Sequence, residues 1–332
     1  MKLKTSKKIV SLLIVAMLGI SVAACSNKED KVADKPKEEK TQQTESKDEK
    51  SVTTKDEYTY DNNEYLTSIS WLEKNMKDNK NLVIIDARSD KDYAKGHIPG
   101  AVNVAWQGLS KMEGKAGDKD WGTLQGEEDL SKTIGALGIS KDSQVVVYAN
   151  KDAWGEDGRV TWSLKRAGVD ARMLNGGFDL WSSEKKETTK DVPEVKPVEM
   201  TVSEIKPDMN ISTDDLKKEY KDLKIIDTRA KDEYEGAVNF GEARGGHLPD
   251  AINVPFTELY NEDGTLKNKD EIVKIMEKAG IKKEDSIATY CTAGIRSAHM
   301  ALALKNAGFE NVRNYDSSFY EWAADESNEV VK

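Results

Sequence analysis

The chain repeats itself over a long period, and this duplication restricts the folds open to it more than any other feature. Residues 84–88 return almost unchanged as residues 225–229, an offset of 225 − 84 = 141, and residues 178–181 return as residues 319–322 at the same offset. A period of this length indicates duplicated domains rather than a solenoid of short repeats. The 332 residues also exceed the size at which one hydrophobic core usually keeps growing, so two domains are expected.

Each copy carries the pattern of an α/β domain. Nearly continuous apolar runs predict buried strands of parallel sheets at residues 82–85, 144–148, 223–226 and 286–290. Helical spacing follows at residues 159–167 and 297–307. Since ligands of such sheets bind beyond the carboxyl ends of the strands, functional loops are expected after Tyr148 and Tyr290.

The copies and their connections set the expected boundaries. We expect domain 1 at residues 61–185, a linker with three prolines at residues 186–207, and domain 2 at residues 208–328. The turn at residues 96–101 matches residues 246–251 at an offset of 150, so the second copy holds nine extra residues (150 − 141 = 9) before that turn.

The first residues predict export. Basic residues precede an apolar run at residues 9–20, which is shorter than the roughly 17–25 residues of a membrane-spanning helix. Small residues then lead to Cys25. This stretch resembles a bacterial lipoprotein signal peptide (residues 1–24), which implies cleavage before Cys25 and a lipid with fatty acids such as palmitate on that cysteine. An uncleaved anchor or an ordinary secretory signal is the alternative.

Composition extends this expectation. Residues 25–60 are charged and contain almost no large apolar side chain, which predicts a disordered tether behind the lipidated Cys25. We therefore expect a protein attached to the cell membrane by lipid, on its extracytoplasmic face. The net charge of -10 argues against a nucleic-acid partner.

Only two cysteines exist, and lipidation of Cys25 would leave Cys291 as the single thiol. Cys291 begins the short loop of residues 291–296, whose backbone N–H groups can form an anion-binding nest at the start of a helix. Those amides, the helix dipole and Arg296 would stabilise a thiolate. The alternative is a buried, inert cysteine.

Several motifs together resemble the rhodanese family. They lie, in family order, at residues 227–229, 234–236, 246–253, 291–297 and 315–322. Both copies look like rhodanese domains over residues 64–324, in a tandem arrangement similar to thiosulfate and 3-mercaptopyruvate sulfurtransferases. The resemblance implies an α/β fold of two tandem rhodanese-like domains, each a parallel five-stranded sheet flanked by helices.

The resemblance also implies a reaction. Cys291 would take a sulfane sulfur from a donor such as thiosulfate, form a persulfide, and pass the sulfur to a thiol or cyanide, without cofactor or metal. The expected substrate-binding residues are those of the loop and two arginines: Thr292, Ala293, Gly294, Ile295, Arg296 and Arg229. Because Arg88 is the twin of Arg229 in the first copy, a structural ion pair is the alternative role for Arg229.

The first copy is predicted to be catalytically empty. Ala149 or Asn150 stands where the second copy has Cys291, and a longer loop follows. Its expected role is to close one wall of the cleft, for which Trp71, Trp106 and Trp121 are candidates, ordinary core or surface positions being the alternative. The histidines carry no metal-ligand spacing.

The residues of the Cys291 loop help to separate the alternative functions. The Cys-Gly-Ser-Gly-Val-Thr pattern expected of a 3-mercaptopyruvate enzyme is absent, so a thiosulfate-like donor is favoured, with the 3-mercaptopyruvate reaction as the alternative. A Cys-based phosphatase would need Cys-x5-Arg, whereas Cys291 and Arg296 are one residue closer. A non-catalytic surface lipoprotein that binds a ligand or partner is the rival from another class.

Overall fold

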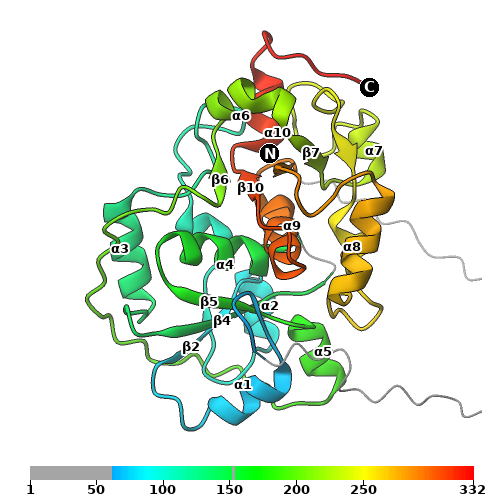
Figure 1. Ribbon diagram of the computed structural model, residues 1–332. Coiled ribbons are helices and arrows are strands. Elements are labelled where there is room, and N and C mark those ends of the chain that lie inside the picture. Colours follow the sequence, from blue (N-terminus) through cyan, green and yellow to red (C-terminus); the bar gives the residue numbers. More distant parts are fainter. Residues whose placement is uncertain (1–61, 152–153) are drawn as a thin grey trace, which may run out of the picture. The chain divides into compact units, whose positions relative to one another are not determined.

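The computed structural model describes residues 62–151 and 154–332 (Figure 1). The predictions of a signal peptide at residues 1–24, and of a lipidated Cys25 and tether at residues 25–60, lie outside the described residues. In the part of the chain that the structure covers, no helix is both long and apolar enough to cross a membrane.

The first half contains one sheet with strand order β1-β5-β4-β2-β3, and all its neighbouring strands are parallel. Its strands are β1 (Leu66–Thr67), β2 (Leu82–Asp86), β3 (Val102–Asn103), β4 (Gln144–Tyr148) and β5 (Asp170–Leu174). Its helices are α1 (Ile69–Asn75), α2 (Asp90–Lys95), α3 (Glu127–Ala136), α4 (Glu156–Arg166) and α5 (Gly177–Ser183), with a 3-10 turn η2 (Trp106–Leu109).

The second half repeats this topology as β6-β10-β9-β7-β8, again with parallel neighbours. Its strands are β6 (Asn210–Ile211), β7 (Lys224–Asp227), β8 (Ile252–Asn253), β9 (Ile287–Tyr290) and β10 (Val312–Tyr315). Its helices are α6 (Thr213–Glu219), α7 (Lys231–Tyr234), α8 (Lys269–Lys278), α9 (Ile295–Asn306) and α10 (Ser318–Ala324), with 3-10 turns η3 (Tyr220–Asp222) and η4 (Phe256–Leu259). The predicted fold class of two parallel five-stranded sheets flanked by helices is confirmed.

The helices that follow the central strands begin earlier than predicted. Helix α4 begins at Glu156 and α9 at Ile295, whereas the spacing predicted residues 159 and 297. The reason is the glycine before each helix: Gly155 and Gly294 have φ of 73° and 78°, a left-handed conformation that glycine adopts without a steric penalty. The chain therefore turns into the helix at once.

Helices α4 and α9 lie side by side and join the two halves of the molecule (Figure 1). Their backbones approach closely at Gly158, where an added Cβ would be 2.4 Å from the Cα of His299. Both helices are buried along most of their length because each packs on its own sheet and on the other helix. This apolar seam unites the two domains in one core.

The segment predicted as a linker, residues 186–207, is extended and packs on the first half. The N–H of Val198 donates to the carbonyl of Gly135 at 3.0 Å, and the N–H of Lys206 donates to Arg166 at 2.9 Å. These bonds hold the connection against α3 and α4 before the second half begins.

Candidate active site

Cys291 lies directly after β9, at the carboxyl end of a central strand, as the topology predicts. Its side chain is buried, with an exposed fraction of 1% for the residue. The turn ends at Gly294, where an added Cβ would be 2.4 Å from the carbonyl oxygen of Asp316. The thiol therefore stands at the N-terminal end of α9, in a turn that requires glycine.

The first turn of α10 holds this loop from below. The N–H of Cys291 donates to the hydroxyl of Ser318 at 3.2 Å, and the N–H groups of Phe319 and Tyr320 donate to the carbonyls of Cys291 and Thr292, each at 3.0 Å. Ser318 itself has φ of 54°, a strained conformation for a residue with a side chain. The loop is thus fixed by backbone contacts from a separate element.

The surroundings of Cys291 favour its thiolate. Burial raises the pKa of the thiol, but the charge of Arg296 and the N–H groups of Ser297 and Ala293 lower it by more, so the net pKa lies below the ordinary value. A thiol with a lowered pKa beside a helix N-terminus is typical of a nucleophilic cysteine.

Arg296 is held in place by a carboxylate that the sequence analysis missed. Its two terminal nitrogens donate to Glu233 at 2.7 and 2.8 Å, and one also donates to the hydroxyl of Thr292 at 2.9 Å. Burial raises the pKa of Glu233, but Arg296 and Arg229 lower it by more, so the pair is charged.

Sequence reasoning had little means of finding Glu233. Its counterpart in the first copy, Asp92, is partly exposed and pairs with Lys95 on the same helix. An acidic residue in that short helix is therefore compatible with an ordinary surface position. Only the fold brings α7 beside the loop after β9.

A cavity of about 360 Å³ opens at Cys291. Its lining residues are Trp106, Gln107, Trp121, Trp154, Glu156, Phe240, Cys291, Thr292, Ala293, Ile295, Arg296 and Tyr320. Of the tryptophans proposed for the cleft wall, Trp106 and Trp121 line the cavity, whereas Trp71 packs against the core of the first domain. Sequence reasoning missed Trp154, Phe240 and Tyr320.

The structure brings most of the predicted substrate-binding residues together. Thr292, Ala293, Ile295 and Arg296 line the cavity, while Gly294 forms the turn behind them.

Arg229 lies apart from the cavity lining. It is fully buried and donates to both carboxylate oxygens of Asp227, at 2.9 and 2.6 Å, and to the carbonyl of Gly246 at 2.7 Å. Arg88 makes the same contacts with Asp86 and Gly96 in the first domain. This repetition favours the structural ion pair over the substrate-binding role.

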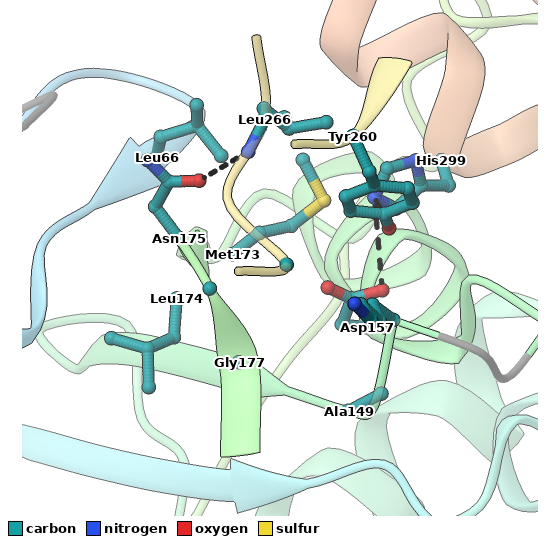
Figure 2. A pocket seen from close by; sticks show the side chains of 13 residues that line it. Leu66, Ala149, Asp157, Met173, Leu174, Asn175, Gly177, Tyr260, Leu266 and His299 are labelled. Atoms are coloured by element: carbon teal, nitrogen blue, oxygen red, sulfur yellow. Dashed lines mark hydrogen bonds and ion pairs between the residues drawn. The ribbon is translucent and has the colours of Figure 1, made fainter. Parts of the chain in front are cut away.

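The first domain has a small cavity where the second has its thiol. Ala149 follows β4 as Cys291 follows β9, and its carbonyl accepts the N–H of Phe178 at 2.9 Å. The space there is about 10 Å³, and Tyr260 and His299 of the second domain are among its lining residues. Figure 2 shows both side chains pointing toward Asp157.

Burial disfavours the charged forms of Asp157 and His299. It raises the pKa of Asp157 to about 7 and lowers the pKa of His299 to about 4. The Nε2 of His299 lies 2.7 Å from the hydroxyl of Tyr260 and 3.9 Å from a carboxyl oxygen of Asp157. Between about pH 4 and pH 7, a neutral Asp157 and a neutral His299 thus face one another between the domains.

Metal ligation has no support in the geometry. Over residues 62–151 and 154–332, no group of three or more His, Cys, Asp or Glu side chains is placed to hold a metal ion.

The first prediction concerns the charge around the thiol. Arg296→Gln should raise the pKa of Cys291, because it removes the cation that favours the thiolate, whereas Glu233→Gln should lower it, because it removes an opposing carboxylate. Absorbance of the thiolate at 240 nm against pH measures this in a Cys25→Ser background, where Cys291 is the only thiol. Arg313→Gln, which breaks an ion pair with Glu219 away from the cavity, is the control. Shifts of the same sign in the Arg296 and Glu233 variants would contradict the assignment.

The second prediction concerns stability against pH. Between pH 3.8 and about 7 the native state holds a proton on Asp157 that the unfolded chain has lost, so this group lowers stability as pH rises. Between about pH 4 and 6.5 the unfolded chain holds a proton on His299 that the native state lacks, so this group raises stability as pH rises. The two slopes oppose one another in the wild type.

Each single variant should therefore unmask the other slope. From pH 4 to 6.5, urea unfolding of Asp157→Asn should show stability rising more steeply with pH than in the wild type, by up to about 1.4 kcal/mol per pH unit. His299→Gln should show the opposite change of slope. Parallel curves for all three proteins would show that neither group has a shifted pKa.

Comparisons with known proteins identify the family of this chain. The family model for the rhodanese-like domain matches residues 68–184 and 212–325. The chain is 32% identical to sulfur carrier protein TtuD of Thermus thermophilus over 285 residues, covering 79% of this chain and 95% of that protein. It is 31% identical to a thiosulfate sulfurtransferase of Corynebacterium glutamicum, covering 79% of this chain and 89% of the relative.

Solved structures share the fold. YnjE has a TM-score of 0.72 at 24% identity, covering 81% of this chain and 68% of that one. The anaerobic ergothioneine biosynthesis enzyme of Chlorobium limicola, solved with trimethyl histidine, has a TM-score of 0.69 at 25% identity, covering 80% and 70%. The two matched domains and the named relatives establish that this chain belongs to the rhodanese family as a tandem-domain sulfurtransferase.

Proposed function

We propose that the protein moves a sulfane sulfur from thiosulfate or a similar donor to a thiol or cyanide, through a persulfide on Cys291. One observation carries the proposal: the Cys291 thiol has a lowered pKa and lies at the floor of an open cavity, beside Arg296 and the first amides of α9. A nucleophilic thiolate in reach of a small substrate is what the reaction requires.

The first step loads sulfur on the enzyme. The Cys291 thiolate attacks the outer sulfur of thiosulfate, the sulfur–sulfur bond of the donor breaks, and sulfite leaves with the electron pair. The negative charge then sits on the outer sulfur of the persulfide, close to Arg296. The Nε of Arg296 makes no hydrogen bond to another described oxygen or nitrogen, so it is available to the charged sulfur.

The second step returns the enzyme to its starting state, with Cys291 as a free thiolate. An acceptor thiolate or cyanide attacks the outer sulfur, the bond between the two sulfurs breaks, and the electron pair returns to Cys291 as thiolate. The same arginine and amides stabilise the anion in both states, so neither form of the enzyme is strongly favoured. A 3-mercaptopyruvate donor would use the same thiol, and only its recognition would differ.

A non-catalytic binding module is the alternative from another class. It accounts for an open cavity but not for the cost of burying Arg296 and Glu233 in full contact beside a thiol. The pair places a positive charge beside the thiol, which lowers the pKa of Cys291 and suits a reacting thiolate.

The third prediction tests the persulfide. Incubation with thiosulfate should add one sulfur atom to Cys291 in intact-protein mass spectrometry, and reduction with dithiothreitol should remove it. Cys25→Ser should gain the same mass, because it keeps the proposed nucleophile, whereas Cys291→Ala should gain none. An unmodified wild type, across thiosulfate, 3-mercaptopyruvate and polysulfide, would favour the binding module.

We also propose that Cys25 carries lipid and holds the protein on the extracytoplasmic face of the cell membrane. The proposal rests on the sequence of residues 1–25, where a basic start and a short apolar run precede the cysteine. Two or more acyl chains give stable attachment, which one chain does not.

The fourth prediction uses the two cysteines as matched controls. The proteins are expressed in a bacterium that is fed an alkyne analogue of palmitate. The wild type and Cys291→Ser should then carry the label and be found with membranes. Cys25→Ser should lose both the label and the membrane association. Label that persists in Cys25→Ser would disprove lipidation at that position.

A further inference from the structure

The cavity at Cys291 holds little net positive charge. Arg296 is the single basic residue among its lining residues, within the described part of the chain, and both terminal nitrogens of its guanidinium are engaged by Glu233. With Cys291 as thiolate or persulfide, the two anions around Arg296 outweigh its one positive charge. Among the described lining residues, Arg296 is therefore the one group that can meet an anionic donor, and the rest of the wall carries no positive charge.

A further carboxylate lies in the cavity wall. Glu156 begins α4, lines the cavity, and accepts the N–H of Trp154 at 2.8 Å. No Lys or Arg pairs with it among residues 62–151 and 154–332. Burial raises the pKa of Glu156 by more than the backbone N–H groups of Glu156 and Trp154 lower it, so the net pKa lies above the ordinary value. A half-enclosed carboxylate without a cation is a place where a cationic ligand gains energy.

Aromatic rings make up the rest of the wall in two groups. Trp154 and Phe240 meet edge to face at 4.6 Å, and the guanidinium of Arg296 lies 4.8 Å from the Trp154 ring. Trp121 meets Tyr320 edge to face at 5.6 Å and Trp106 at 6.5 Å. The first group already binds a cation of the protein itself, while no described Lys or Arg lies over a ring of the second.

The first group comes from segments that break the duplication. Trp154 belongs to the longer loop that replaces the thiol loop in the first copy, and Phe240 belongs to the nine extra residues of the second. Because neither segment has a counterpart in the other domain, this first group of rings occurs at this site alone. A cavity of about 360 Å³ also falls in the size range of sites for organic ligands, and is far larger than cyanide needs.

We propose that the sulfur acceptor is a small organic thiol bearing a quaternary ammonium group, held by the wall of Trp106, Trp121 and Tyr320 and by the carboxylate of Glu156. The inference rests on the proposed persulfide of Cys291 and names its acceptor class. Quaternary ammonium ions bind aromatic faces because the ring quadrupole attracts a weakly hydrated cation. The acceptor thiolate attacks the outer persulfide sulfur, and the electron pair of the broken bond returns to Cys291.

The fifth prediction compares three thiols that differ mainly in charge. Thiocholine is cationic, 3,3-dimethylbutane-1-thiol is its neutral analogue, and 2-mercaptoethanesulfonate is anionic. Protein loaded with sulfur beforehand should react with the three in single-turnover experiments followed by mass spectrometry. The ratio of rates between wild type and each variant cancels the intrinsic reactivity of each thiol.

Two substitutions in the cavity and one outside it give the expected pattern. Trp121→Leu and Glu156→Gln should each slow transfer to thiocholine by roughly 5- to 30-fold, and change the neutral thiol much less. Glu156→Gln should also speed transfer to the anionic thiol. Trp71→Leu, the same kind of change away from the cavity, should leave all three rates as in the wild type.

The outcomes separate this inference from the proposed function. Two results would overturn the acceptor class while leaving the persulfide intact. One is that the cavity variants slow transfer to all three thiols equally. The other is that Glu156→Gln transfers sulfur to the anionic thiol no faster than the wild type does. Absence of a persulfide on the wild type would instead overturn the proposed function. In that case, calorimetry with Cys291→Ser still tests which charge the cavity prefers to bind. Phenyltrimethylammonium should bind more tightly than benzenesulfonate, and the reverse order would overturn the inference.

Discussion

The structure depends on one buried ion pair between its halves, that of Arg159 and Asp316. The side chain of Arg159, on α4, is fully buried and contacts the carboxylate of Asp316. Asp316 follows β10, and its carboxylate also accepts the N–H of Leu124 at 2.9 Å. The backbone of Asp316 in turn packs against Gly294, at the turn of the thiol loop. A cation of the first domain therefore sets the position of the loop that carries Cys291. Removing either partner would leave a buried charge without compensation, which is far costlier than the net gain from the pair.

This arrangement explains how duplication serves a single reaction. The two domains keep the same scaffold pairs, Asp86 with Arg88 and Asp227 with Arg229, because both sheets need them. They differ where the central strand ends: one domain has Ala149 beside a cavity of about 10 Å³, and the other has Cys291 beside a cavity of about 360 Å³. The first domain contributes walls and support to the cavity, and the second contributes Cys291, the proposed nucleophile.

The sequence predicted some parts of the site and not others, for a physical reason. Cys291 and its loop are contiguous, so their position after a buried strand follows from local pattern. The roles of Arg229 and Glu233 do not follow from local pattern. Arg229 belongs to a motif, but the fold uses it in an internal ion pair with Asp227. Glu233 has no distinctive sequence context, but the fold brings it to Arg296. Contact between residues far apart in the chain has no signature in a single sequence.

The sequence by itself determined the duplicated α/β fold, the strand ends at which loops gather, and the position of Cys291 directly after a buried strand, because apolar periodicity and chain connectivity act locally. The tertiary structure decided which side chains surround that thiol: Arg296 with its carboxylate partner, and the aromatic wall that includes Trp121 and Trp154. The ion pair joins two elements of the second half, whereas the ring contacts join the two halves of the chain. The complete wall of the cavity therefore forms only when the two domains pack together.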